Sequence, residues 1–194
     1  MGKPDHTKQL LADALRRLLQ TKRYADITVA DIVRECGVSR YTFYYHFKDK
    51  QDLVNWIYLD TRAKAIKVSS VDTVYDNCQR LISLMKEDAA LYNQVRHDID
   101  QNGFKEYYYQ LNYHCYLNVF KSYLGERKLS PEIAGCMGRF FSYAGSELFM
   151  DAMEGKLQVP LEQVVDIMDV IWKYGMYGAL DYYAQKEEKT EKAE

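Results

Sequence analysis

Residues 28–50 read TVADIVRECGVSRYTFYYHFKDK, and this stretch decides the fold. Thr28 and Asp31 have the spacing of a capping box, which opens a helix. Gly37 ends that helix, because glycine readily adopts a positive φ at a helix end. Ser39 can cap a second short helix only two residues later. Two short helices joined by so tight a turn predict a helix-turn-helix.

The rest of the chain is also typical of helices, and no strand-like alternation competes. An apolar stripe between Leu10 and Leu19 predicts a first helix, and Asp49 can cap one that runs to about Lys67. Further helices are expected over about 73–86, 89–99, 104–124, 131–154 and 161–183. We therefore expect an all-α protein of about nine helices. The expected parts are a three-helix DNA-binding domain at 6–50, a helical domain at 51–185 and a charged, frayed tail at 186–194.

The charge of the chain is distributed unevenly. The formal net charge is only −2, yet residues 1–50 hold ten Lys and Arg against six Asp and Glu. The remaining residues hold 16 basic and 22 acidic side chains. A basic N-terminal end on an acidic body concentrates the attraction for phosphates at that end, so the overall charge does not argue against DNA binding.

The second helix of a helix-turn-helix enters the major groove, and its first residues reach the base edges. Arg40 can donate two hydrogen bonds to guanine, and Tyr41 offers a hydroxyl and an apolar ring for a thymine methyl. Thr42 lies beside them in the same first turn. Phosphate contacts are expected from Tyr44, Tyr45, His46, Lys50 and, at the start of the preceding helix, Thr28.

Residues 37–53, GVSRYTFYYHFKDKQDL, resemble the signature of the Tet repressor (TetR/AcrR) family, and the likeness extends over residues 8–58. The resemblance implies a transcriptional regulator that binds a palindromic operator as a homodimer. It also implies that residues from about 52 onward sense a ligand or a protein partner. The DNA-contact positions that it implies are Thr28, Arg40, Tyr41, Thr42, Tyr44, His46 and Lys50, with Phe43 and Phe47 in the core.

Residues 102–108, NGFKEYY, are similar to a subgroup of that family which includes regulators of dihydroxyacetone kinase operons. This second likeness implies a small metabolite or a protein co-regulator as partner. Because members of the subgroup can act as activators, the sign of regulation stays open.

The C-terminal body is rich in tyrosine, since 13 of the 18 tyrosines follow residue 74. Tyrosine rings can line a pocket, with their hydroxyls orienting a ligand. A packed core with phenols at its rim explains the same pattern. The pocket residues that we predict are Arg96, Tyr108, His114 and Tyr143, and His97 is a further polar anchor.

The last two long helices carry broad apolar surfaces, at residues 137–149 and 164–175. Each glycine within a helix costs about 1 kcal/mol relative to alanine, which close helix approach would offset. Two such helices from each of two chains would make a four-helix dimer interface, although both could instead be buried in a monomer. The interface residues that we predict are Phe140, Phe141, Leu148, Met168, Ile171 and Trp172. A dimer would also space two recognition helices for a palindrome.

Other classes of protein find little support. The phosphate-loop and dinucleotide glycine motifs are missing, and the four histidines lack metal-ligand spacing, so we expect no catalytic residue, metal or cofactor. No apolar run is long enough for a membrane span and no secretory signal is visible, so a cytoplasmic protein with four reduced core cysteines is expected. Two alternatives stay open: an interaction module that has lost its DNA role, and a regulator without a small ligand.

Overall fold

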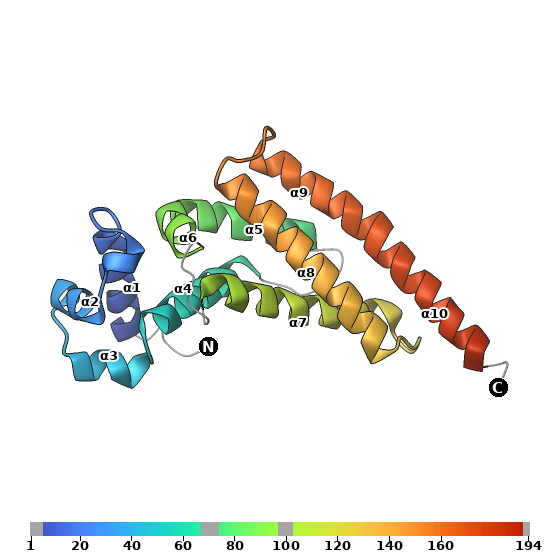
Figure 1. The fold of residues 1–194 in the computed structure, drawn as a ribbon, viewed down its shortest axis with the longest axis horizontal. Coiled ribbons are helices and arrows are strands. Elements are labelled where there is room, and N and C mark those ends of the chain that lie inside the picture. Colours follow the sequence, from blue (N-terminus) through green and yellow to red (C-terminus); the bar gives the residue numbers. More distant parts are fainter. Residues whose placement is uncertain (1–5, 67–73, 97–102, 192–194) are drawn as a thin grey trace. The chain divides into compact units, whose positions relative to one another are not determined.

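The computed structural model describes residues 6–66, 74–96 and 103–191, and every regular element in these ranges is helical (Figure 1). This confirms the all-α expectation. The chain divides into two compact units, which are described separately. The first unit holds residues 1–67 and 80–107, and the second holds 68–79 and 108–194.

The N-terminal head belongs to the first unit. It consists of α1 (His6–Leu18), the short 3₁₀ helix η1 (Tyr24–Asp26), α2 (Val29–Cys36) and α3 (Arg40–His46). Leu11 and Leu15 from the predicted stripe of α1 are fully buried, as are Ile32 of α2 and Phe43 of α3. Because α1 packs against α2, and α2 against α3, one small apolar core fixes the position of α3.

The helix ends of the head follow the predicted capping chemistry. The Thr28 hydroxyl accepts from the Asp31 N–H, while the Asp31 carboxylate accepts from the Thr28 N–H, which completes the capping box. Gly37 has φ of 73°, and the Ser39 hydroxyl accepts from the Thr42 N–H at 3.0 Å. The turn between α2 and α3 is therefore confirmed.

Two further helices share the first unit with the head, namely α4 (Lys50–Ala65) and α6 (Ala89–Val95). Arg16 of α1 donates two hydrogen bonds from Nε and Nη2 to Asp88, at 2.8 and 2.7 Å, directly before α6. The Tyr24 N–H donates to Gln94 Oε1 of α6 at 2.7 Å. The predicted domain boundary at residue 50 thus falls inside a compact unit, because polar contacts attach α6 to the head.

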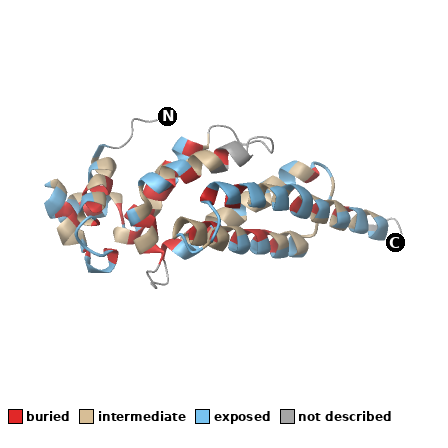
Figure 2. Cartoon of the chain, turned by 90° about the horizontal axis from the view of Figure 1, so that it is seen from above, coloured by how far each residue is buried: buried red, intermediate tan, exposed pale blue. Residues whose placement is uncertain are grey.

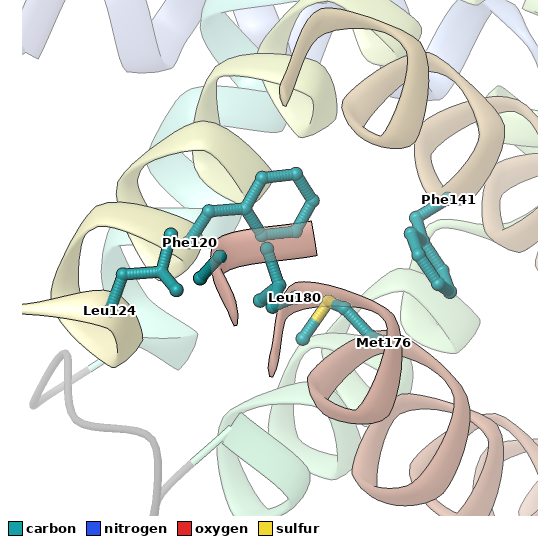
Figure 3. Packing of buried hydrophobic residues seen from close by; sticks show 6 residues of the cluster. Phe120, Leu124, Phe141, Met176 and Leu180 are labelled. Carbon is teal, nitrogen blue, oxygen red and sulfur yellow. The ribbon is translucent and has the colours of Figure 1, made fainter. Parts of the chain in front are cut away.

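The second unit is built from long helices, α7 (Phe104–Leu124), α8 (Pro131–Met153) and a rod of α9 (Leu161–Val170), η3 (Ile171–Met176) and α10 (Tyr177–Glu191). The first four residues of α7 belong to the first unit, and α5 (Val74–Glu87) is likewise divided between the two. The core between α7, α8 and the rod is formed by Phe120, Leu124, Phe141, Met176, Leu180 and Ala184 (Figure 3).

The C-terminal rod differs from the expectation in two ways. The helix continues to Glu191, so the prediction of a frayed tail from residue 186 is wrong over 186–191. In its middle, η3 is a π-helix, whose i→i+5 hydrogen bonds widen the turn. Neither feature has a local signal as strong as a cap or a proline.

Two observations bear on the predicted absences and on the cysteines. Among the described residues, no helix is both long and apolar enough to cross a membrane, and no group of three metal-ligating side chains gathers. Cys36 and Cys115 are partly buried, whereas Cys136 is exposed. The expectation of a core position is therefore wrong for Cys136, and the side chain of Cys78 lies outside the described residues.

Candidate nucleic-acid interface

The two faces of α3 differ sharply. Phe43 is fully buried and Phe47, the residue after the helix, is 3% exposed, so both pack into the head as predicted. On the opposite face Tyr41 and Tyr45 are 81% and 75% exposed. Large aromatic side chains that are left in solvent along one face of a helix are available for contact with a partner.

The first turn of α3 presents the predicted base-reading side chains. Arg40 directly follows the cap residue Ser39, is exposed and forms no ion pair within the described part of the chain. Thr42 is half-buried, and its hydroxyl lies 2.9 Å from that of Ser39. Arg40 and Tyr41 are therefore free to bind, whereas Thr42 also contributes to the cap.

The last turn of α3 contains Tyr44 and His46. Tyr44 is 57% exposed and sets its ring edge-on against Phe43, with ring centroids 5.5 Å apart. His46 is half-buried and lies between Tyr45 and Phe47, with centroids at 5.0 and 6.4 Å. These ring contacts hold both side chains in place at the surface.

Lys50 occupies a position that differs from the sequence expectation. Its ammonium donates to the carbonyls of Tyr24 and Ile27 at 2.8 and 3.1 Å and lies 4.2 Å from the centroid of the Tyr24 ring. Two of its three N–H donors thus hold the segment between η1 and α2. The structure therefore gives Lys50 a role inside the head, and its predicted phosphate contact would have to use the remaining donor.

Thr28 is committed in a similar way. Its hydroxyl donates to Asp31 Oδ2 at 2.8 Å while accepting from the Asp31 N–H at 3.2 Å. The pKa of Asp31 lies well below its ordinary value, first because of the Thr28 N–H, then because of the Thr28 hydroxyl and of Lys22. A phosphate at Thr28 would compete with this carboxylate, so its predicted contact stays a prediction.

Sequence reasoning missed Lys48. This residue lies between α3 and α4 and its side chain is exposed. Within the described part of the chain only its backbone N–H forms a hydrogen bond, which it donates to Asp52 Oδ2 at 3.0 Å. The sequence did offer a signal for an exposed side chain here. Lys48 directly precedes the cap residue Asp49, and a residue before a cap lies outside the helix.

The four predicted pocket residues do not share one environment. Arg96 is 9% exposed and belongs to the first unit, while the other three belong to the second. Tyr108 is buried and stacks on Phe149, His114 is exposed, and Tyr143 is 45% exposed beside Tyr109. The pocket stays a prediction, and His97 lies outside the described residues.

The predicted interface residues show three degrees of exposure. Phe140 and Ile171 are 66% and 48% exposed, and Figure 2 shows much of the rod that ends at the C-terminus as exposed. Leu148, Met168 and Trp172 are half-buried. Phe141 is 8% exposed and packs in the core of its own chain, which leaves little of its side chain for a partner, and its place in an interface stays a prediction.

Comparisons with known proteins agree with this arrangement. Solved structures include a dihydroxyacetone kinase operon activator, DhaS, with a TM-score of 0.59 and 21% identity over 84% of this chain and 91% of that one. A TetR transcriptional regulator from Streptococcus agalactiae has a TM-score of 0.59 and 19% identity over 86% and 93% of the two chains. At such identities the likeness shows the fold alone.

Two curated relatives match in sequence. The transcriptional activator DhaS of the dhaKLM operon from Lactococcus lactis is 28% identical over 102 residues, which are 53% of this chain and 54% of the relative. The transcriptional regulator EthR from Mycolicibacterium smegmatis is 45% identical over 47 residues, 24% and 21% of the two chains. The alignments therefore span about half and about a fifth of the relatives' own lengths.

Two family models match the chain. The model for bacterial regulatory proteins of the tetR family matches residues 11–57, which contain the whole of α2 and α3. The model for a transcriptional regulator C-terminal region matches residues 72–174, more than half of the 194 residues. The chain therefore belongs to the tetR family of DNA-binding transcriptional regulators.

Proposed function

We propose that this regulator binds a palindromic operator as a homodimer, with α3 of each copy in the major groove. The observation that carries the proposal is the exposed first turn of α3, where Arg40 and Tyr41 point away from a core that holds Phe43. Arg40 reads guanine, and Tyr41 contacts a neighbouring base. Thr42 lies beside this base-reading pair, and the phosphates are contacted by Tyr44, Tyr45, His46 and the exposed Lys48, with smaller parts for Thr28 and Lys50.

The second unit supports the homodimer. Val170, Ile171 and Tyr174 are 53%, 48% and 79% exposed on one rod, and Phe140 of α8 is 66% exposed. Exposed apolar side chains gathered along adjacent helices are typical of interaction surfaces, and a self-complementary surface gives a two-fold dimer. The two-fold symmetry of the protein would then match that of the operator.

We further propose that an effector, a small molecule or a protein co-regulator, changes operator affinity through α6. The contacts of Asp88 with Arg16 and of Gln94 with Tyr24 mean that a displacement of α6 acts directly on the head. An effector works only through its different affinities for the two arrangements, so the operator must change effector affinity by the same factor. The likeness to an activator makes activation the first sign of regulation to test.

The deciding experiment is selection of bound sequences from a random DNA pool, with the wild-type protein beside Arg40→Ala. We expect a palindromic consensus in which one base pair of each half-site relaxes in the variant, at a cost of about 1–3 kcal/mol per contact. Affinity should fall steeply as salt rises, because bound phosphates release counterions.

A matched control is Arg139→Ala, which removes an exposed arginine from α8 rather than from α3. This control should select the wild-type consensus with unchanged affinity. If the wild-type protein enriched no sequence, or if Arg40→Ala and Arg139→Ala behaved alike, the base-reading role of α3 would be rejected. A module that binds protein partners instead of DNA would then be favoured.

A further inference from the structure

Gln94 of α6 lies outside the predicted DNA-binding domain at 6–50, yet its side chain is hydrogen-bonded to the head. Its Oε1 accepts from the Tyr24 N–H at 2.7 Å, and α6 contacts η1. Both helices belong to the first unit. A residue from the part of the chain that is expected to sense an effector thus reaches the backbone of the head.

The peptide groups on both sides of the Tyr24 Cα are hydrogen-bonded. Gln94 of α6 accepts from the N–H on one side. The carbonyl on the other side accepts from the Lys50 ammonium of α4 at 2.8 Å and from the Ile27 N–H at 3.1 Å. Because peptide groups are planar, anchoring both of them restricts the two dihedral angles between them. The backbone at Tyr24 is therefore held by two helices, α4 and α6.

The side chain of Tyr24 is anchored as well. It is 2% exposed, and the Lys50 ammonium lies 4.2 Å from the centroid of its ring. The Tyr24 hydroxyl donates to Gln51 Oε1 at 3.2 Å. Lys50 and Gln51 both belong to α4, whereas Gln94 brings α6 into the same set of contacts.

The anchored segment leads directly into α2. Ile27 is 1% exposed, its carbonyl accepts from Lys50 at 3.1 Å, and the next residue, Thr28, is the cap of α2. Because α2 packs against α3, the position of residues 24–27 bears on the position of the recognition helix. Hydrogen bonds to base edges weaken steeply when their angles change, so a small displacement of this segment matters for DNA binding.

We propose that Gln94 is a positioning residue for operator binding, which acts through Tyr24 and holds the head in its DNA-binding arrangement when no effector is present. The inference rests on the proposed reading of an operator by α3, and it adds a residue that is not itself expected to contact DNA. Without the hydrogen bond, a smaller fraction of heads has the binding arrangement, and the apparent affinity falls by that fraction. The base preference stays the same, because Arg40 and Tyr41 are unchanged.

The test compares Gln94→Met, which has a side chain of similar size without the acceptor, with Gln94→Glu, which keeps an acceptor for the Tyr24 N–H. The probe is the DNA sequence that the wild-type protein selects. Gln94→Met should bind it roughly two- to tenfold more weakly, as expected for one hydrogen bond, and should select the same consensus. Hydrogen exchange around Tyr24, measured by mass spectrometry without DNA, should be faster in Gln94→Met and unchanged in Gln94→Glu.

Asn93→Asp is the matched control for charge, because it adds a carboxylate at the neighbouring position of α6. Gln94→Glu should bind the selected DNA as tightly as Asn93→Asp does. If Gln94→Glu instead bound as weakly as Gln94→Met while Asn93→Asp matched the wild type, the acceptor at residue 94 would not be the feature that matters, and the inference would be overturned.

Affinities are measured well below the melting temperature, with circular dichroism to confirm the fold, so that lower stability alone leaves them unchanged. Wild-type affinity in a folded Gln94→Met would overturn the inference and leave Gln94 a structural contact. Gln94→Asn, whose amide is shorter by one methylene group, replaces Gln94→Met if the latter does not fold, with the same outcomes. Failure of the proposed function would show in the wild-type protein itself, which would then enrich no sequence, and the inference would fall with it.

Discussion

Residues 40, 41 and 50 lie within one short stretch, and the structure gives them different tasks. The side chains of Arg40 and Tyr41 are exposed to solvent. The Lys50 ammonium instead donates two hydrogen bonds, to the carbonyls of Tyr24 and Ile27. Both carbonyls gain a charged donor, and the Tyr24 carbonyl also accepts from the Ile27 N–H, so this lysine stabilises the head even without DNA. The proposed DNA contacts and the stabilisation of the head are thus divided among neighbouring residues.

Thr28→Ala tests the capping box. The loss of the hydroxyl should lower the free energy of unfolding by about 1 kcal/mol at neutral pH. Part of this difference depends on ionised Asp31, whose pKa is lowered by the Thr28 N–H, the Thr28 hydroxyl and Lys22. A lowered carboxyl pKa stabilises the fold above the unfolded value of about 4, and that stabilisation is lost as the pH falls below it.

The difference between wild type and Thr28→Ala should therefore stay constant down to about pH 4 and shrink as the pH falls from about 4 to about 2, towards the lowered pKa of Asp31, in urea titrations followed by circular dichroism. Thr21→Ala is the control, because this exposed hydroxyl donates only to the Leu18 carbonyl. A difference that stayed constant over the same pH range would show that the hydroxyl does not stabilise the Asp31 carboxylate.

The residue roles that sequence reasoning predicted correctly are local ones. The caps at Thr28, Ser39 and Asp49 are contacts across three residues, and each is confirmed. The role of Lys50 depends on η1, more than twenty residues earlier, which the pattern of the sequence did not indicate. Local hydrogen-bond chemistry is readable from one sequence, whereas the partner of a long flexible side chain is not.

At the scale of the elements, α7 and α8 approach closely through glycines. A Cβ at Gly138 would lie 2.9 Å from Tyr113 Cε2 and 3.3 Å from Leu117 Cδ2, whereas one at Gly135 would come no closer than 3.5 Å to the Tyr113 hydroxyl. The expected close approach thus occurs within one chain. Sequence composition suggested the approach but not which helix would make it.

Gly138→Ala and Gly135→Ala form a matched pair on α8. Alanine gains up to about 1 kcal/mol of helix propensity at either position. At Gly138 the crowded Tyr113 ring should outweigh that gain, for a net loss of about 1 kcal/mol, whereas Gly135→Ala should be stabilising. Chemical denaturation measures both, and stabilisation by both variants would show that the α7–α8 contact is looser than the structure indicates.

The last helix was predicted as one continuous α-helix, whereas the structure has the π-helical segment η3 in its middle, and the spacing of the buried residues accounts for this segment. From Val164 onward a row of buried or half-buried residues recurs at every fourth position of the rod, and Leu161 and Val165 are buried beside it; the row is Val164, Met168, Trp172, Met176, Leu180 and Ala184. An α-helix turns 3.6 residues at a time, so a spacing of four drifts by about 40° per step. A wider turn in the middle reduces that drift. Such a spacing is visible in the sequence but also fits a helix that curves around its neighbours.

At the scale of the whole molecule, the regulator separates its two proposed interactions between its two units. The first unit presents α3 for DNA, and the second presents the exposed apolar surface of α8 and the rod. The family was predictable from residues 37–53, because base reading and the tight turn constrain that stretch closely. The body was less predictable, since many apolar sequences satisfy a helical core equally well.

Ile171→Glu tests the dimer without disturbing the chain's own core, because this side chain is 48% exposed on the rod. A charge buried without a partner in the interface should make the protein a monomer in size-exclusion chromatography with light scattering. Affinity for a palindromic operator should then fall on the order of a hundredfold, because the two half-sites are no longer bound by linked heads.

Val159→Glu is the matched control, since Val159 is an exposed apolar residue that lies in the loop before α9 rather than on the rod. It should remain dimeric with wild-type operator affinity. If Ile171→Glu stayed dimeric, the exposed surface of the rod would not be the interface. If Ile171→Glu became monomeric and still bound the palindrome as tightly as wild type, dimerisation through this surface would not be needed to bind the two half-sites together.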